Sequence, residues 1–177
     1  MSALSLKTAL LTTRPSFLVL TPVCIFLGLS TTLNHQAGIN PYLSFFIFIG
    51  AIFAHISVNM LNEYFDFKSG LDLKTIKTQY SGGSGALPNH PEAVKLVLVI
   101  GVLSLLITVA TGLYLIADRG SIIIPVGVVG IVLIVTYTQW INRIPFLCLL
   151  APGLGFGILM VVGTYVALTG THAQLPW

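Results

Sequence analysis

The candidate functional residues in this sequence are a small set of acidic side chains. The chain has 177 residues and only 5 Asp or Glu. All but one of these fall between residues 63 and 92, and they are Glu63, Asp66, Asp72 and Glu92. Oxygen ligands grouped in this way suit a hard divalent cation, and magnesium is typically held by one or two carboxylates together with substrate phosphates. Asn62, Asp66 and Asp72 fit that task.

The acidic segment continues a polar stripe that begins inside an apolar run. Its members are His55, Asn59, Asn62, Glu63 and Asp66. At about 100° per residue they fall within an arc of about 100°, the width of one helix surface. Ionisable groups facing lipid are costly, so the stripe must face a bundle or a wet cavity. Gly70 is a predicted helix stop, with Asp72 folding back from the following turn.

Two simpler interpretations stand beside the metal site. The acidic residues at the helix end can be ordinary polar groups that cap and solvate a loop. For His55, a neutral side chain hydrogen-bonded within a bundle is the simpler interpretation than a metal ligand. The whole stripe, in a chain with so few acids, favours function.

The elements that position these residues are predicted to be membrane helices. Hydrophobic residues make up 55% of the chain and charged residues 7%, against about 25% charged in typical soluble proteins. So few charges cannot cover a water-soluble globule, which excludes a soluble enzyme, and the hydrophobicity excludes disorder. The basic residues are scattered among apolar runs, so a nucleic-acid-binding face is excluded. We expect an all-α integral membrane protein in contact with the lipid bilayer.

Five apolar runs reach the length of about 20 residues that a bilayer core requires. They are residues 16–33, 42–61, 93–117, 121–140 and 145–169. Seven of the 8 Lys and Arg side chains then fall on one side, and Arg119 on the other. Because basic residues favour the cytoplasmic side, we expect the N-terminus and a loop at 62–91 to be cytoplasmic, or on the equivalent side in an organelle.

The acidic motif resembles that of a known family. Residues 62–72 read N-E-Y-F-D-F-K-S-G-L-D and are similar to the first aspartate-rich motif, N-D-x-x-D-x-x-x-D, of the UbiA-type intramembrane aromatic prenyltransferases. Asn62 and Asp66 match directly, Glu63 stands where Asp is usual, and Asp72 lies six residues after Asp66. This wider spacing resembles the menaquinone branch, the dihydroxynaphthoate polyprenyltransferases.

Other stretches carry the same resemblance. Arg14-Pro15, with residues 20–22, is similar to the branch's opening, and residues 153–165 are similar to its fifth helix. Residues 82–85, Gly-Gly-Ser-Gly, resemble its glycine-rich loop, for which a flexible loop is the alternative interpretation. The resemblance runs across most of the chain.

The resemblance implies a reaction and a set of roles. Family members bind a polyprenyl diphosphate through Mg²⁺, release diphosphate, and alkylate an aromatic acceptor such as a quinone precursor. Asp66, Asn62 and Asp72 are implied as catalytic and metal-binding residues, with Glu63 as a further metal ligand. The implied diphosphate contacts are Lys68, Lys74, Lys77 and Arg143, although anchoring at the membrane surface is an equal interpretation of the lysines. A bacterial inner membrane is the expected location.

The chain departs from the family in two respects. The family's Y-x-x-x-K pattern after helix four is unmatched, because Tyr137 is followed four residues later by Ile141, and the second half of the family's site is missing. The family fold has nine transmembrane helices and a second aspartate-rich motif after the sixth, whereas beyond residue 92 the only acid here is Asp118. Three interpretations follow: a fragment of a longer enzyme, a half that pairs with a second polypeptide or with itself, or an inactive remnant. We rank the fragment first.

Two other functions are alternatives to the prenyltransferase interpretation. The CDP-alcohol phosphotransferases, also magnesium-dependent membrane enzymes, show D-G-x-x-A-R, and that string does not occur here. A small transporter or channel subunit, with His55, Asn59 and Asp66 lining a pathway, is the alternative outside enzymes. Against it, no charged residue lies near the midplane of a predicted span and no inverted second half is visible.

Overall fold

The protein is helical throughout the part of the chain that the structure describes. The computed structural model describes residues 3–34, 39–74 and 83–171. Within these ranges four helical segments are long and apolar enough to cross a membrane: Pro15–Leu33, Pro41–Ser69, Pro91–Tyr137 and Pro145–Thr169. The third has 47 residues, enough to cross twice. The predicted all-α integral membrane fold is confirmed.

The elements follow one another with short connections. In chain order they are α1 (Ala3–Thr12), α2 (Pro15–Leu18), α3 (Leu20–Asn34), α4 (Pro41–Ser69), α5 (Leu71–Lys74), α6 (Ala86–Asn89), η1 (Pro91–Ala93), α7 (Val94–Arg119), η2 (Gly120–Ile123), α8 (Ile124–Gln139), η3 (Ile141–Arg143), α9 (Pro145–Pro152), η4 (Gly153–Val162) and α10 (Gly163–Thr169). Several of them begin at a proline, a residue preorganised for the first helical position.

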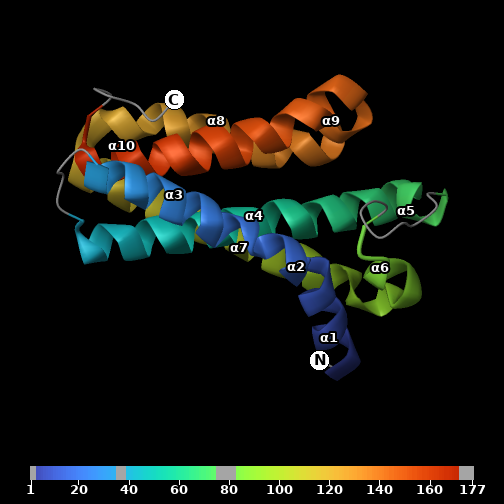
Figure 1. The fold of residues 1–177 in the computed structure, drawn as a ribbon. Helices are drawn as coiled ribbons and strands as arrows, with labels where there is room; N and C mark the ends of the chain where they lie inside the picture. The colour runs from blue at the N-terminus through green and yellow to red at the C-terminus, as the bar shows by residue number, and fades with distance from the viewer. Residues whose placement is uncertain (1–2, 35–38, 75–82, 172–177) are drawn as a thin grey trace.

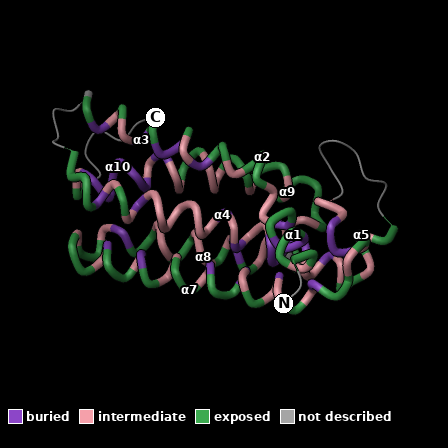
Figure 2. Tube along the Cα trace, turned by 90° about the horizontal axis from the view of Figure 1, so that it is seen from below, coloured by how far each residue is buried: buried purple, intermediate pink, exposed green. Residues whose placement is uncertain are grey.

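The long helices lie side by side, and the short helices α1, α5 and α6 lie toward one end, with α10 at the other (Figure 1). In that view α5 lies at the right end of α4, with α6 below it and α9 above it. α1 projects downward from the same half of the molecule. Exposed positions line the outer surfaces of these helices, and buried ones face between them (Figure 2). The exposed surface is largely apolar, as expected for helices in contact with lipid.

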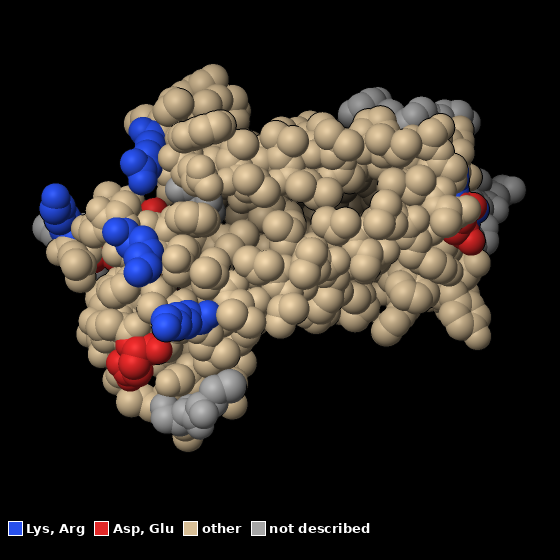
Figure 3. All heavy atoms as spheres, turned by 180° about the vertical axis from the view of Figure 1, so that it is seen from behind, with Lys and Arg blue, Asp and Glu red and all other residues tan. Residues whose placement is uncertain are grey.

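Charge divides the molecule along its length. On the face shown in Figure 3, nearly all the Lys, Arg, Asp and Glu side chains gather at one end, and a single small group lies at the other. Asp118 and Arg119 form an ion pair at 3.2 Å at the C-terminal end of α7. The apolar surface between the two ends is what a bilayer core requires.

The central helix is α4, which packs along α7 and also contacts α8. Asn40 starts it, because its side-chain oxygen accepts hydrogen bonds from the backbone N–H groups of Tyr42 and Leu43, at 3.0 and 3.3 Å. At the opposite end Gly70 adopts a left-handed conformation, φ 74°. Its N–H bonds to the carbonyls of Asp66 and Phe67, so α4 stops where the sequence predicted.

Two buried apolar clusters hold the bundle together. The larger lies toward the start of α4 and includes Leu43, Ile47, Leu115 and Tyr165. The smaller joins α1, α6 and η1 to α4 and α7, and consists of Ala9, Met60, Leu87, Ala93 and Val97. This smaller cluster fixes the short elements beside the end of α4.

The segment expected as a loop at 62–91 is partly helical. Residues 62–69 complete α4, and short helices follow at Leu71–Lys74 and Ala86–Asn89. The helical period of the stripe therefore persists through the acidic motif, and Asn62, Glu63 and Asp66 lie on one rigid helix. Lys77 lies outside the described residues.

Candidate functional site

The polar stripe of α4 faces the interior. His55, Asn62, Glu63 and Asp66 are buried, and Asn59 is half-buried. The His55 ring nitrogen Nδ1 lies 2.8 Å from the Thr21 hydroxyl of α3. The Asn59 amide donates to the backbone carbonyl of Thr13 at 2.9 Å. His55 and Asn59 thus each meet a partner from the N-terminal part of the chain, as buried polar groups require.

Asn62 and Asp66 form a hydrogen-bonded pair one helical turn apart. The Asn62 amide donates to Asp66 Oδ2 at 2.8 Å. From η3, the Asn142 amide donates to Asn62 Oδ1 and to Asp66 Oδ1, at 3.2 and 3.3 Å. Two amide groups therefore fix the Asp66 carboxylate, and their donors leave lone pairs on its oxygens for another ligand.

Glu63 lies on the same helix but is engaged differently. Its Oε1 accepts from Arg14 Nε at 2.9 Å and from Arg14 Nη2 at 2.7 Å. The Ser84 backbone N–H also donates to Oε1, and the Ser84 hydroxyl donates to Oε2 at 2.7 Å. The Glu63 side chain is 0% exposed, so its charge is compensated within the protein.

Asp72 returns toward this cluster from α5, as the sequence predicted. A Cβ atom built on Gly83 would lie 3.3 Å from Asp72 Oδ1, 3.1 Å from Glu63 Oε1 and 3.5 Å from Arg14 Nη2. Asp72, Glu63 and Arg14 therefore converge on one glycine, which needs both its positive φ of 70° and its lack of a side chain.

The environment of Asp72 is short of positive charge. Burial, followed by the nearby Glu63 and Asp66 carboxylates, raises the pKa of Asp72 to about 6, although Arg14 opposes the shift. Asp72 Oδ2 is buried and has no hydrogen-bond partner among the described residues. A cation beside this oxygen would satisfy it and favour the charged carboxylate.

The basic residues predicted at the site lie at its margin. Lys68, Lys74 and Arg143 are exposed, and they share the end of the molecule that carries the acidic cluster. The residue before Arg143, Asn142, is the one that reaches Asp66. These positions suit either a membrane-surface role or a diphosphate approaching from outside.

Sequence reasoning assigned no site role to three residues that complete the cluster. These are Arg14, Ser84 and Asn142. Arg14 and Ser84 fell within stretches noted for their resemblance to a family, which was the available signal. Arg14 also has a positive φ of 53°, a strained conformation that persists only where surrounding contacts hold it.

A cavity of about 800 Å³ begins at this cluster and runs into the bundle. Residues from Ile47 to Asn62 of α4 line it, which corresponds to about 22 Å at the 1.5 Å rise of an α-helix. Arg14, Asn59, Asn62 and Tyr137 belong to its polar part. Elsewhere the lining is mostly apolar.

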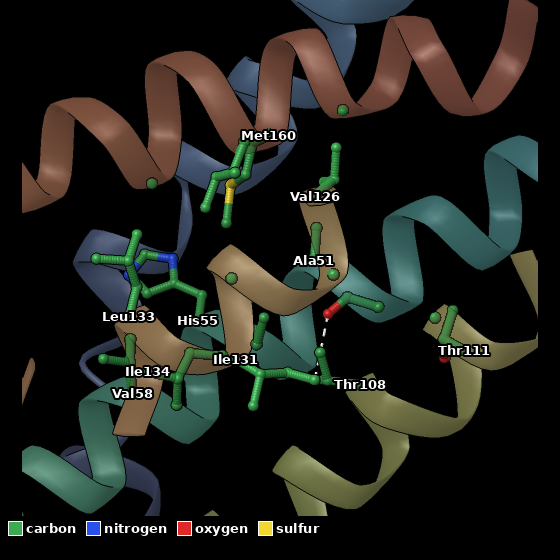
Figure 4. Close-up of a pocket in the computed structure, with 18 of the residues that line it drawn as sticks. Ala51, His55, Val58, Thr108, Thr111, Val126, Ile131, Leu133, Ile134 and Met160 are labelled. Atoms are coloured by element: carbon green, nitrogen blue, oxygen red, sulfur yellow. Dashed lines mark hydrogen bonds between the residues drawn. The ribbon is translucent and has the colours of Figure 1, made fainter. Parts of the chain in front are cut away.

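The middle of the cavity is shown in Figure 4. Ala51, His55 and Val58 from α4 face a space bounded by Leu133 and Ile134 of α8 and by Met160 of η4 (Figure 4). The His55 ring also packs edge-on against Phe156, with ring centroids 4.8 Å apart. The far part of the cavity is lined by Ile47 and Leu115, which belong to the larger apolar cluster.

The donor set fits a magnesium ion bound together with a substrate. In the described ranges, no three His, Cys, Asp or Glu side chains group closely enough to hold a metal by themselves. Asn62, Asp66 and Asp72 supply oxygen atoms only, and one of those oxygens is buried without a partner. Two carboxylates and an amide are the partial shell that magnesium adopts when phosphate oxygens and water complete it.

The fold and the cluster define a class: a helical integral membrane protein with a carboxylate site at the mouth of an apolar cavity. Residues 19–177 match the model of the UbiA prenyltransferase family. This match covers most of the chain, and the chain belongs to that family.

A curated relative sharpens the comparison. The chain is 28% identical over 126 residues to the 1,4-dihydroxy-2-naphthoate octaprenyltransferase of Bacillus subtilis (strain 168). The matched stretch covers 71% of this chain and 39% of the relative. The matched stretch therefore spans well under half the length of that protein. No solved structure matches the chain.

Proposed function

We propose that this chain binds a polyprenyl diphosphate for transfer of the prenyl group to an aromatic acceptor. The observation that carries the proposal is a cavity that reaches Arg14 and Asn62, which hydrogen-bond to the carboxylates of Glu63 and Asp66. From there it continues along about 22 Å of largely apolar lining. A prenyl diphosphate has the matching division, with a highly charged head and a long apolar tail. The membership of the UbiA prenyltransferase family supports the same activity.

The head group is assigned to the polar end. Asn62, Asp66 and Asp72 would hold Mg²⁺, and the ion would neutralise charge developing on the diphosphate as it leaves. Arg14 lines the cavity there, and it has N–H groups beyond the two that bond to Glu63. These remaining groups are available to phosphate oxygens. The exposed Lys68, Lys74 and Arg143 are assigned to the approach of the diphosphate, and so is Lys77 on its sequence position.

The prenyl chain is assigned to the apolar lining. Ala51, Val58 and Ile134 border the middle of the cavity, where they would exclude water from an allylic cation formed at the head. The acceptor is proposed to be a dihydroxynaphthoate-like ring, on the basis of the Bacillus relative. That places the chain in menaquinone biosynthesis.

The remaining assignments concern the setting. We place the protein in a bacterial inner membrane, with the N-terminus and the acidic cluster on the cytoplasmic side, because the basic residues gather at that end. Since the matched stretch covers 39% of the relative, we propose that further helices complete the catalytic bundle. These could come from a longer form of this chain or from a second polypeptide.

Binding tests the proposal directly. The purified chain in lipid nanodiscs is titrated with farnesyl thiodiphosphate, with and without Mg²⁺, and membranes that contain the chain are assayed with a polyprenyl diphosphate and 1,4-dihydroxy-2-naphthoate. We expect binding that requires Mg²⁺ and a prenylated product. Binding that is indifferent to Mg²⁺, or transport of the ligand without product, would contradict the enzyme assignment and favour a transporter.

A further inference from the structure

Glu63 is the point at which three distant parts of the chain meet. Arg14 comes from the junction of α1 and α2, Glu63 from α4, and Ser84 from the turn before α6. Arg14 lies 49 residues before Glu63 in the sequence, and Ser84 lies 21 residues after it. We call this set, Arg14, Glu63 and Ser84, the Glu63 clasp.

The contacts of the clasp leave little room for a metal ion at Glu63. A carboxylate offers about four lone-pair positions. Two N–H groups of Arg14, one backbone N–H and one hydroxyl already point at it. Three of these donors meet Oε1 and only the Ser84 hydroxyl meets Oε2. A divalent cation could therefore approach only Oε2, on a fully buried carboxylate that already pairs with the Arg14 guanidinium, where like charges repel.

The clasp also determines where the Ser84 turn lies. Gly83 and Gly85, with φ of 70° and 69°, flank Ser84 and let its N–H and hydroxyl reach the same carboxylate. Gly83 then lies so near Asp72 that a Cβ atom built on it would be 3.3 Å from Asp72 Oδ1. Fixing Ser84 on Glu63 therefore fixes the surroundings of a residue assigned to the metal.

Arg14 is oriented by the same carboxylate. Nε and Nη2 both bond to Glu63 Oε1, which sets the plane of the guanidinium. The Arg14 side chain remains 25% exposed and lines the cavity. Glu63 thus holds the guanidinium of Arg14 at the polar end of the cavity.

We propose that Glu63 is a positioning residue and not a metal ligand. It orients Arg14 and holds the Ser84 turn around the diphosphate site, a role that rests on the proposed function. The longer side chain of Glu suits this role. An Asp at residue 63 would retract the carboxylate by about one bond length of some 1.5 Å, beyond hydrogen-bonding reach of Ser84 and Arg14.

The clasp itself is tested by hydrogen–deuterium exchange, without any ligand. The whole chain in nanodiscs is compared with Glu63→Gln and with Glu63→Asp, which serves if the first variant folds poorly. Glu92→Gln is the matched control, because Glu92 is an exposed acid of the same segment outside the clasp. We expect the Ser84–Leu87 amides to exchange about tenfold faster in the Glu63 variants, as for loss of charge-assisted hydrogen bonds. Unchanged exchange in both variants would overturn the clasp.

The positioning role is tested by separating two affinities. In Glu63→Gln we expect the dissociation constant for farnesyl thiodiphosphate to rise about tenfold. The Mg²⁺ concentration for half-maximal binding should stay within about twofold of the original chain, since the metal ligands are intact. Asp72→Asn is expected to raise the Mg²⁺ concentration for half-maximal binding, because it removes a proposed metal ligand. A similar rise in Glu63→Gln would overturn the proposal and make Glu63 a ligand. A loss of stability alone would lower the bound fraction without changing either constant.

The two proposals fail in different ways. If the original chain shows no Mg²⁺-dependent binding of farnesyl thiodiphosphate, the proposed function is contradicted, and the exchange experiment still decides whether Glu63 holds the Ser84 turn. If the ligand binds and exchange is unaltered in the Glu63 variants, the proposed function stands and the clasp is wrong.

Discussion

The two ends of the cavity are built from the same helix and solve opposite problems. At one end α4 presents Asn62, Glu63 and Asp66, and each of them is hydrogen-bonded to a residue from another part of the chain or to a neighbour on the helix. Toward the other end it presents Ile47, Gly50 and Ala51, which line the space with apolar groups.

The difference between the polar and the apolar end shows how a membrane protein keeps charge and apolar surface apart. A buried carboxylate requires partners, because an unpaired charge in a low-dielectric interior is costly. The partners of α4 therefore come from the junction of α1 and α2, from η3 and from the Ser84 turn. An apolar cavity requires only small residues and distance between helices, so the middle of α4 needs no such network.

At the polar end, we expect the largest loss of ligand binding when the charge of Asp66 is removed. We expect Asp66→Asn to weaken Mg²⁺-dependent binding of farnesyl thiodiphosphate, and any turnover, by about a hundredfold or more, since even second-shell changes at metal sites cost 10–100-fold. Asp118→Asn is the control, because Asp118 lies in the ion pair with Arg119 outside this cluster. Equal effects of the two substitutions would remove Asp66 from the site.

The apolar end is tested by filling it. Ala51→Phe places a ring in the cavity, so we expect affinity for farnesyl thiodiphosphate to fall about tenfold, the order of effect that one or more lost apolar contacts produce. Binding of Mn²⁺ as a magnesium probe, followed by electron paramagnetic resonance, should be unchanged. Ala110→Phe is the matched control on the exposed face of α7. If Ala110→Phe weakens the ligand equally, the cavity is not where the prenyl chain binds.

Gly83→Ala tests how closely the Gly83 backbone must approach Glu63 and Asp72 at the polar end. The new Cβ meets Glu63 and Asp72 at 3.1 and 3.3 Å, and the left-handed backbone adds about 1–2 kcal/mol of strain. Gly70→Ala carries the same backbone strain, but its Cβ meets nothing within 4 Å. We therefore expect both to lower the melting temperature, and only Gly83→Ala to weaken ligand binding severalfold. Similar affinities for the two variants would show that the Gly83 contact does not matter.

The smallest expected effect is a dependence of stability on pH. Because the pKa of Asp72 is raised to about 6 from an ordinary value near 4, the folded state takes up a proton more readily than the unfolded chain. Without divalent cations, this group should make the chain more stable as the pH falls from about 7 to about 5.

Thermal unfolding in detergent at the two pH values measures this effect. The contribution should be missing in Asp72→Asn and retained in Glu92→Gln, whose carboxylate is exposed. Added Mg²⁺ should reverse the trend, since the metal favours the ionised carboxylate. A pH dependence that is identical in Asp72→Asn and in the original chain would contradict the assignment to Asp72.

Features that depend on neighbouring residues could be predicted from the sequence. The polar stripe on α4, its end at Gly70 and the return of Asp72 all follow from helical periodicity and glycine conformation. The membrane-spanning character follows from hydrophobic length alone. The acidic motif was also visible because so few acids occur elsewhere.

Features that depend on packing could not be predicted in this way. Asn142 lies 76 residues from Asp66, and no spacing rule connects them. Glu63 has the residue type and the motif position of a metal ligand, but its surroundings occupy the carboxylate with Arg14 and Ser84. Only the three-dimensional arrangement distinguishes the two roles, and the sequence alone left Glu63 among the metal ligands.

The span between Asp66 and Asn142 has a consequence for biosynthesis. When the ribosome has made the first 120 residues, the chain already contains every acidic residue of the cluster, but not the amide of η3 that bonds to Asp66 and Asn62. Asp66 is therefore synthesised well before its last partner. Until Asn142 has been synthesised and has packed against α4, Asp66 has to rely on Asn62, on water or on a cation.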